Sequence, residues 1–252
     1  MQADGQAEAL HGKALALTCR CCEHPRMKMP LIGILATLTL ALAVRAAEFA
    51  PLFPNDGTPA GFVVRHWSDV SLPSRDAASW VVKDGVLTSE GARGCWLLSE
   101  KEYGDFELEY EFKLGPMGNS GLALRAPIKG DPAFDGMEMQ MADRRYTAQM
   151  KDSELTAGIY RAVAPTKQLY KPEEWNKVRV KIEGSKLRVE INGEVVQDID
   201  LSKFDKAVLR HDNTEAPALK DRPAKGRIGF QELSRGGSHV LIRGARIREL
   251  AK

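Results

Sequence analysis

From residue 62 onward, the hydrophobic positions of the chain recur at every second residue. Segment 105–114 shows this most clearly, with charged side chains at most of the intervening positions and apolar ones at Phe106, Leu108, Tyr110, Phe112 and Leu114. Successive side chains of a β-strand point to opposite faces, whereas a helix would scatter these residues around its axis. The segment therefore predicts a strand with one face in a hydrophobic core.

Turn signals separate the strand-like segments. Asp84-Gly85 and Asn192-Gly193 each lie between two short apolar runs, and both pairs accept the positive φ of a tight hairpin turn. Such signals recur about every 8–12 residues, as they do in sandwiches and barrels. Segment 202–225 is the least patterned and is interpreted as a long loop with at most one helical turn. These features predict one all-β domain without a sustained helix.

Residues 27–46 have the layout of a secretory signal peptide. Lys28 precedes an apolar run over 31–44 that is too short to span a bilayer comfortably, and residues suited to signal peptidase follow it. We expect cleavage after Ala46 or Ala47, and a protein that is exported to the periplasm or the extracellular space. A retained membrane anchor is the alternative.

Residues 1–26 do not fit this layout, because a signal peptide starts at its basic region. We interpret them as an upstream extension and expect residues 47–252 to form one mature domain that does not span the membrane. Three of the four cysteines lie before residue 27, so Cys95 has no internal disulfide partner in the mature domain. A domain of this size buries enough surface to fold without disulfides.

The composition gives no sign of a nucleic-acid partner. A hydrophobic content of 43% and a charged content of 28% are typical of a globular protein. The formal net charge of +2 creates no long-range field that would attract nucleic acid or an anionic membrane.

The segment around residue 138 is the strongest candidate for chemistry. Alternation places Glu138 and Gln140 on one face of a strand, roughly 6.5–7 Å apart, and three methionines on the other. An acid and an amide on a rigid strand can bind sugar hydroxyls, ligate a hard metal ion or position a base. Asp143 joins that face only if the strand ends or bulges before it. The alternative is the polar outer face of an antiparallel sheet.

Two further segments carry polar side chains on predicted strands. In segment 118–127, Leu122 and Leu124 face the core and Arg125 faces the other side, where it can also be an ordinary surface residue. In segment 156–165, Tyr160 offers a stacking face and a hydroxyl. The sequence contains neither a Gly-x-Ser-x-Gly nucleophile elbow nor a His-Glu-x-x-His metal pair.

Taken in order, these segments resemble the 3-keto-disaccharide hydrolase family, long known as a bacterial domain of unknown function. The central motifs are Gly118-Asn119-Ser120-Gly121 with Arg125, and Gly136-Met137-Glu138-Met139-Gln140. The other matching pieces lie at 80–87, 103–108, 157–160, 175–176, 192–193, 229–231 and 242–243. The resemblance covers about residues 50 to 250, and the joint order of the pieces is more specific than any one of them.

The resemblance implies a concanavalin A-like jelly roll, in which two antiparallel sheets pack together and a concave face binds sugar. It also implies substrates whose C3 hydroxyl has been oxidised to a ketone by an upstream sugar 3-oxidising enzyme. The ketone acidifies the C2 proton, so the glycosidic bond breaks by proton abstraction and elimination, and water then adds back. A divalent metal ion is one candidate for the electrophile near the ketone oxygen.

The resemblance also implies roles for individual side chains. Glu138 would be the base or a metal ligand, and Tyr160 the acid or a stacking platform. The remaining implied site residues are Gln140 and Asp143, which would hold the metal or the sugar, and Asn119 and Arg125, which would bind hydroxyls or the enolate.

One departure from the family leaves the function open. Many members carry an Asp-His pair after the Gly-x-Gln segment, where this chain has Glu232-Leu233. His211 and His239 are the candidates to replace that histidine. A non-catalytic lectin-like module is the main alternative to an enzyme, and a structural envelope protein is the third possibility.

Overall fold

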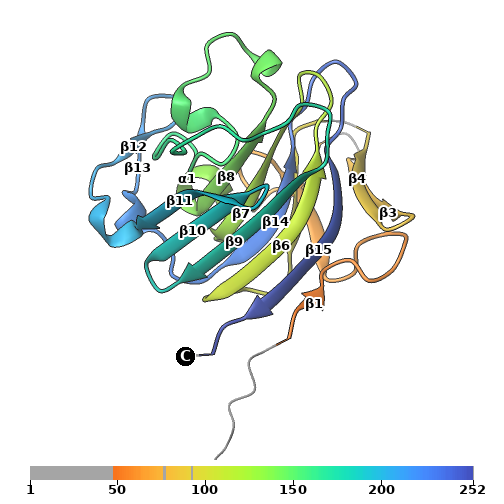
Figure 1. Cartoon of the computed structure of the whole chain (residues 1–252), viewed down its shortest axis with the longest axis horizontal. Coiled ribbons are helices and arrows are strands. Elements are labelled where there is room, and N and C mark those ends of the chain that lie inside the picture. Colours follow the sequence, from red (N-terminus) through yellow and green to blue (C-terminus); the bar gives the residue numbers. More distant parts are fainter. Residues whose placement is uncertain (1–47, 76–77, 92, 252) are drawn as a thin grey trace, which may run out of the picture. The chain divides into compact units, whose positions relative to one another are not determined.

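The computed structural model describes residues 48–75, 78–91 and 93–251, which form two antiparallel β-sheets packed face to face (Figure 1). The expected signal peptide and upstream extension lie outside the described residues. Within the described ranges, no helix is long and apolar enough to cross a membrane. The predicted all-β jelly-roll sandwich is confirmed.

The larger sheet runs in the order β11-β10-β9-β6-β15-β4-β3, with β1 added beside β15. Its strands are β1 (Ala50–Pro51), β3 (Ser79–Lys83), β4 (Val86–Glu90), β6 (Phe106–Lys113), β9 (Asn176–Glu183), β10 (Lys186–Ile191), β11 (Glu194–Asp200) and β15 (Leu241–Glu249). The predicted hairpin turns join β3 to β4 and β10 to β11, and both residues of each turn have positive φ.

The smaller sheet runs in the order β2-β5-β14-β7-β8. Its strands are β2 (Phe62–His66), β5 (Cys95–Ser99), β7 (Asn119–Ala126), β8 (Met137–Ala142) and β14 (Arg227–Glu232). A short helix α1 (Pro132–Asp135) connects β7 to β8. Segment 202–225, predicted as a loop, contains the small hairpin of β12 (Val208–Leu209) and β13 (Glu215–Ala216), and two 3-10 turns flank that hairpin.

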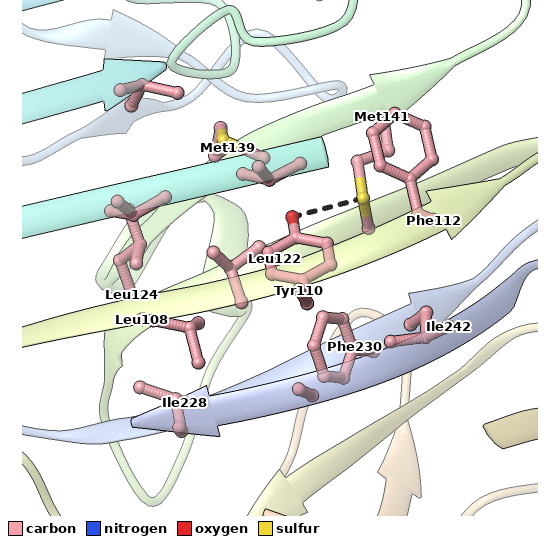
Figure 2. Packing of buried hydrophobic residues seen from close by; sticks show 14 of the residues in the cluster. Leu108, Tyr110, Phe112, Leu122, Leu124, Met139, Met141, Ile228, Phe230 and Ile242 are labelled. Atoms are coloured by element: carbon pink, nitrogen blue, oxygen red, sulfur yellow. Dashed lines mark hydrogen bonds between the residues drawn. The ribbon is translucent and has the colours of Figure 1, made fainter. Parts of the chain in front are cut away.

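Alternate residues of facing strands fill the core between the sheets. All five apolar residues of the predicted strand 105–114 are buried, as expected. The methionines of β8 meet them from the smaller sheet, and the Tyr110 hydroxyl donates a hydrogen bond of 3.2 Å to the sulfur of Met141 (Figure 2). This packing fixes which face of β8 points away from the core, and therefore where Glu138 and Gln140 lie.

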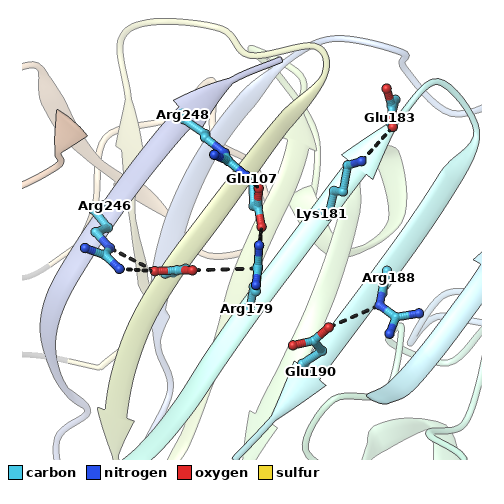
Figure 3. Close-up of polar contacts among 9 residues, drawn as sticks. Glu107, Arg179, Lys181, Glu183, Arg188, Glu190, Arg246 and Arg248 are labelled. Atoms are coloured by element: carbon cyan, nitrogen blue, oxygen red, sulfur yellow. Dashed lines mark hydrogen bonds and ion pairs between the residues drawn. The ribbon is translucent and has the colours of Figure 1, made fainter. Parts of the chain in front are cut away.

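The outer face of the larger sheet is a lattice of ion pairs. Glu107 on β6 pairs with Arg179 on β9 and Arg248 on β15, and Glu109 pairs with Arg246 (Figure 3). Burial raises the pKa of Glu107, but the hydrogen bonds from the two arginines outweigh it and hold that pKa below its ordinary value. The lining of a hollow of about 890 Å³ on this face includes Glu109, Arg179 and Arg246 from these pairs. On this face, glutamates on one strand therefore neutralise arginines on the neighbouring strands.

Candidate functional site

The outward face of the smaller sheet collects the polar residues that the sequence singled out. Glu138 and Gln140 on β8, Asn119 on β7 and Gln231 on β14 all lie on or beside it. We predicted an open polar face as the alternative to a site, but all four side chains are buried, Glu138 to 2% exposure. Loops that cross this face account for the burial, and they turn it into a closed site.

A small chamber of about 30 Å³ surrounds these side chains. The loop residues that wall it are Trp67, Asp131, Ala133, Tyr160, His211 and Leu233. Five of the lining residues also line a cleft of about 590 Å³, so the chamber adjoins the cleft. A cleft of that volume accommodates a small glycoside, and Trp67 offers it an aromatic face.

The Glu138 carboxyl is the most desolvated group in the chamber. It lies across Gly121 on the neighbouring strand, and its Oε1 atom has no hydrogen-bond partner among the described residues. Burial, and secondarily the nearby carboxyl of Asp131, raise the pKa of Glu138 well above its ordinary value. A raised pKa favours the protonated form of this carboxyl, which is the form that can donate a proton.

Asp131 is a second carboxyl of the chamber that the sequence analysis did not identify. It caps the N-terminus of α1 by accepting a 3.0 Å hydrogen bond from the Ala133 amide. Burial is the main cause that raises the pKa of Asp131 to about 7. The Asp131-Pro132 pair is a helix-start signal, since proline suits the first helical position, and it could have revealed this residue.

Tyr160 and His211 form the polar pair at the outer wall of the chamber. The backbone amide of Tyr160 donates to the Glu138 carbonyl, which fixes the tyrosine beside β8. Its hydroxyl lies 3.4 Å from the Nε2 atom of His211, and Phe134 packs edge-on against both rings. The two residues therefore act as one unit at the entrance to the chamber.

Their surroundings keep both groups of this pair neutral. Burial, followed by the charge of Glu138, raises the pKa of Tyr160 above its ordinary value. His211 is exposed to solvent on one side, yet partial desolvation and then the charge of Arg161 lower its pKa. At neutral pH the tyrosine can donate a proton and the imidazole can accept one.

Arg125 does not join the site, contrary to the prediction. Its backbone has a φ of 53°, which breaks the alternation of β7 and turns the side chain away from the chamber. The guanidinium donates to the carbonyls of Gly104 and Gly184 and pairs with Asp105 at 2.9 Å. With 3% of its side chain exposed, it ties the smaller sheet to turns of the larger one.

The predicted metal set of Glu138, Gln140 and Asp143 does not assemble. Asp143 accepts hydrogen bonds from the Arg145 side chain at 2.7 and 2.8 Å and from Tyr170, and it does not line the chamber. The Oε1 atom of Gln140 accepts from the Met141 amide. Within the described ranges, no three His, Cys, Asp or Glu side chains are grouped to hold a metal ion. These residues do not fit a divalent metal.

Comparison with known proteins fits this arrangement. Residues 48–248 match the family model described as "3-keto-alpha-glucoside-1,2-lyase-like domain". The chain belongs to this family. A comparison with curated proteins gave no match. Membership places the chain among carbohydrate-active proteins.

Solved structures of Parabacteroides distasonis proteins have the same fold as this chain. One, named a "putative glycosyl hydrolase", is 26% identical, with a TM-score of 0.62 and coverage of 81% of this chain and 100% of that one. A second protein of the same printed description is 21% identical, with a TM-score of 0.58 and coverage of 77% and 91%. At that lower identity the likeness shows the fold alone.

Glu232-Leu233, where the chain departs from the family pattern, lies at the end of β14. Glu232 is fully buried and accepts hydrogen bonds from the amides of Ser234 and Val240, and His239 lies 3.5 Å from it. Neither Glu232 nor His239 lines the chamber or the cleft, whereas Leu233 lines both. Of the two histidines that the sequence left open, His211 is the one at the chamber.

Proposed function

We propose that the protein cleaves 3-keto-glycosides by abstracting the C2 proton and eliminating the C1 substituent. One observation carries this proposal: Glu138, whose carboxyl pKa burial raises well above its ordinary value, and His211, whose pKa is lowered, line the same chamber. Enolate formation next to a ketone requires such an acid and base together. Membership in the 3-keto-glucoside lyase-like family supports the same substrate class.

The scheme gives each polar residue a role. His211 accepts the C2 proton, and the Glu138 carboxyl donates to the ketone oxygen at C3 while the enolate forms. When the ketone re-forms, the C3 oxygen returns its proton to the Glu138 carboxylate, the electron pair moves into a C1–C2 double bond and the C1–O bond breaks. We assign the proton on the leaving oxygen to the Tyr160 hydroxyl. Water then adds across the double bond, which makes the net reaction a hydrolysis.

This assignment changes the role that the sequence suggested for Glu138. A general base must be ionised, but the carboxyl is desolvated and lies near the second carboxyl of Asp131. Protonated, the group resembles the neutral carboxylic acids that other enzymes use to donate to an enolate oxygen. Asn119, Gln140 and Gln231 remain to bind sugar hydroxyls, and the Asn119 Oδ1 atom has no partner among the described residues.

Turnover in D₂O tests the proposal. A 3-keto-glucoside should be cleaved, and the released 3-keto-glucose should carry deuterium at C2, because the proton at C2 is lost and replaced. Product incubated without enzyme measures spontaneous exchange, and the unoxidised glucoside should stay intact. Cleavage that retains hydrogen at C2 would contradict the mechanism. Sugar binding without turnover of any 3-keto-glycoside would favour the lectin-like alternative.

The substrate also implies an earlier reaction. The C3 ketone has to be formed by an enzyme that oxidises the C3 hydroxyl of a glycoside, and we infer that the two enzymes act in sequence. We further infer that the reaction takes place outside the cytoplasm, because residues 27–46 resemble a signal peptide.

A further inference from the structure

Arginines surround the mouth of the cleft. Arg75, Arg93 and Arg235 are exposed and line it, together with the half-buried Arg161. Glu154 is the carboxylate that lines the same cleft among the described residues, and it is already paired with Arg161 at 2.9 Å. The mouth therefore carries positive charge that the described part of the chain does not neutralise.

Two of these arginines are held in place by neutral groups. Arg93 donates through Nε and Nη2 to the Leu233 carbonyl and through Nη2 to the Tyr146 hydroxyl at 3.1 Å. The Arg235 guanidinium stacks over the Tyr146 ring at 4.4 Å. Tyr146 thus brings two guanidinium groups together, and preorganised arginines of this kind recognise carboxylate, sulfate and phosphate.

The arginines on the outer face of the larger sheet behave differently. There, Arg179, Arg188 and Arg246 each contact a carboxylate. At the cleft, neither Arg93 nor Arg235 forms an ion pair with a described residue, and polar atoms nearby also lack partners. The Nε2 atom of His66 lines the cleft, buried to 5% residue exposure, without a hydrogen bond. An external polar ligand would satisfy these groups.

We infer that the cleft selects glycosides whose part outside the chamber carries an anionic group, which Arg93 and Arg235 bind. The inference rests on the proposed function, which sets where the reacting sugar lies relative to these arginines. The anionic group is a carboxylate, sulfonate, sulfate or phosphate on the leaving portion, since these groups accept hydrogen bonds from a guanidinium fork.

Matched aryl 3-keto-glucosides test this selectivity. The pair is 4-(carboxymethyl)phenyl and 4-(carbamoylmethyl)phenyl 3-keto-glucoside, in which the methylene insulates the leaving oxygen from the charge. We expect kcat/KM to favour the anionic compound by about tenfold, the size expected for one charge-assisted hydrogen bond. A 4-(sulfomethyl)phenyl compound then distinguishes a carboxylate preference from a general anion preference.

Variants connect the preference to the arginines. The double variant Arg93→Gln/Arg235→Gln should bring the anionic-to-neutral ratio close to one, and each single variant should lower it. Arg188→Gln removes one positive charge, as each single variant does, but on the outer face of β10, and it should leave the ratio unchanged. Thermal unfolding checks that each variant is folded, and higher ionic strength should reduce the wild-type ratio.

The outcomes separate this inference from the proposed function. Equal kcat/KM for the two keto-glucosides would overturn the anion preference while the cleavage activity stood. If neither compound were cleaved, calorimetric binding of the corresponding unoxidised aryl glucosides would still test the arginines. Tighter binding of the anionic glucoside, lost in the double variant, would support the inference, and equal binding would overturn it.

Discussion

The Glu138 carboxyl occupies the space that a side chain at residue 121 would fill. A Cβ atom placed on Gly121 would stand 1.8 Å from the Oε1 atom of Glu138. The two residues lie on adjacent strands, β7 and β8, and Gly121 pairs directly with Gln140. Glycine is therefore required at this position to let the carboxyl lie flat across the sheet.

Gly121→Ala should displace Glu138 and reduce turnover without unfolding the protein. The clash is with the end of a side chain, which can rotate away, and the backbone of Gly121 has no positive φ to maintain. We expect a loss of at least about 10²-fold in kcat/KM, comparable to removal of one transition-state donor. Gly104→Ala is the control, because its nearest atom would be 3.9 Å away. Unchanged kcat/KM in Gly121→Ala would show that the carboxyl position is not critical.

Glu138→Gln should lower turnover of a 3-keto-glycoside by about 10²–10⁴-fold, because an amide keeps the shape but cannot transfer a proton. Stability should change little, since the amide has the shape of the carboxyl, whose raised pKa favours its neutral form. Asp143→Asn serves as the control: it weakens contacts to Arg145 and Tyr170 outside the chamber and should leave kcat nearly intact. A large loss of kcat in folded Asp143→Asn would restore the metal-ligand interpretation.

The pH profile of kcat/KM should be bell-shaped. The acid limb reports protonation of His211, whose lowered pKa places the loss of activity below the ordinary histidine range, under about pH 6.5. The alkaline limb reports ionisation of Glu138, whose pKa is raised, so activity is lost only as pH rises above its usual range. His211→Asn should remove the acid limb from the residual activity. Activity that rises with pH from 4 to 5 and stays high would instead indicate an ionised carboxylate base.

Arg125→Met should destabilise the protein without altering substrate selectivity. The substitution removes the ion pair with Asp105 and leaves the carbonyls of Gly104 and Gly184 without their donor. Removing one partner of a buried pair costs about 3 kcal/mol in the free energy of unfolding. Arg188→Met, at a half-buried position on the outer face of β10, should change the free energy of unfolding by less than about 0.5 kcal/mol. Denaturant unfolding measures both, and a KM effect in folded Arg125→Met would return the residue to the binding site.

The exported protein should begin near Ala47. Strand β1 starts at Ala50, which pairs with Ile247 on β15, so cleavage after Ala46 or Ala47 leaves the first strand complete. Intact mass of material recovered from outside the cytoplasm measures the new terminus. A mass that still includes residue 27 would indicate a retained anchor.

Local periodicity determined much of this protein. Alternation placed Phe106 and Phe112 in the core and put Glu138 and Gln140 on one face, because a strand's side-chain direction depends only on residue parity. The turn pairs at residues 84 and 192 needed positive φ, and the structure has it there. The same rule was wrong at Arg125, where a single residue of positive φ reversed the side chain.

Only the tertiary structure decided what the polar face became. The alternation of side chains along a strand could not show that the loops carrying Trp67, Asp131 and His211 would fold over this face. Those loops lie far apart in the chain, and their residues show no regular hydrophobic pattern. Their closure removes water from Glu138 and brings Asp131 near it, and both effects raise the carboxyl pKa. The sequence determined that a carboxyl would face away from the core, whereas desolvation, a property of the surroundings in space, decided that its pKa would be raised.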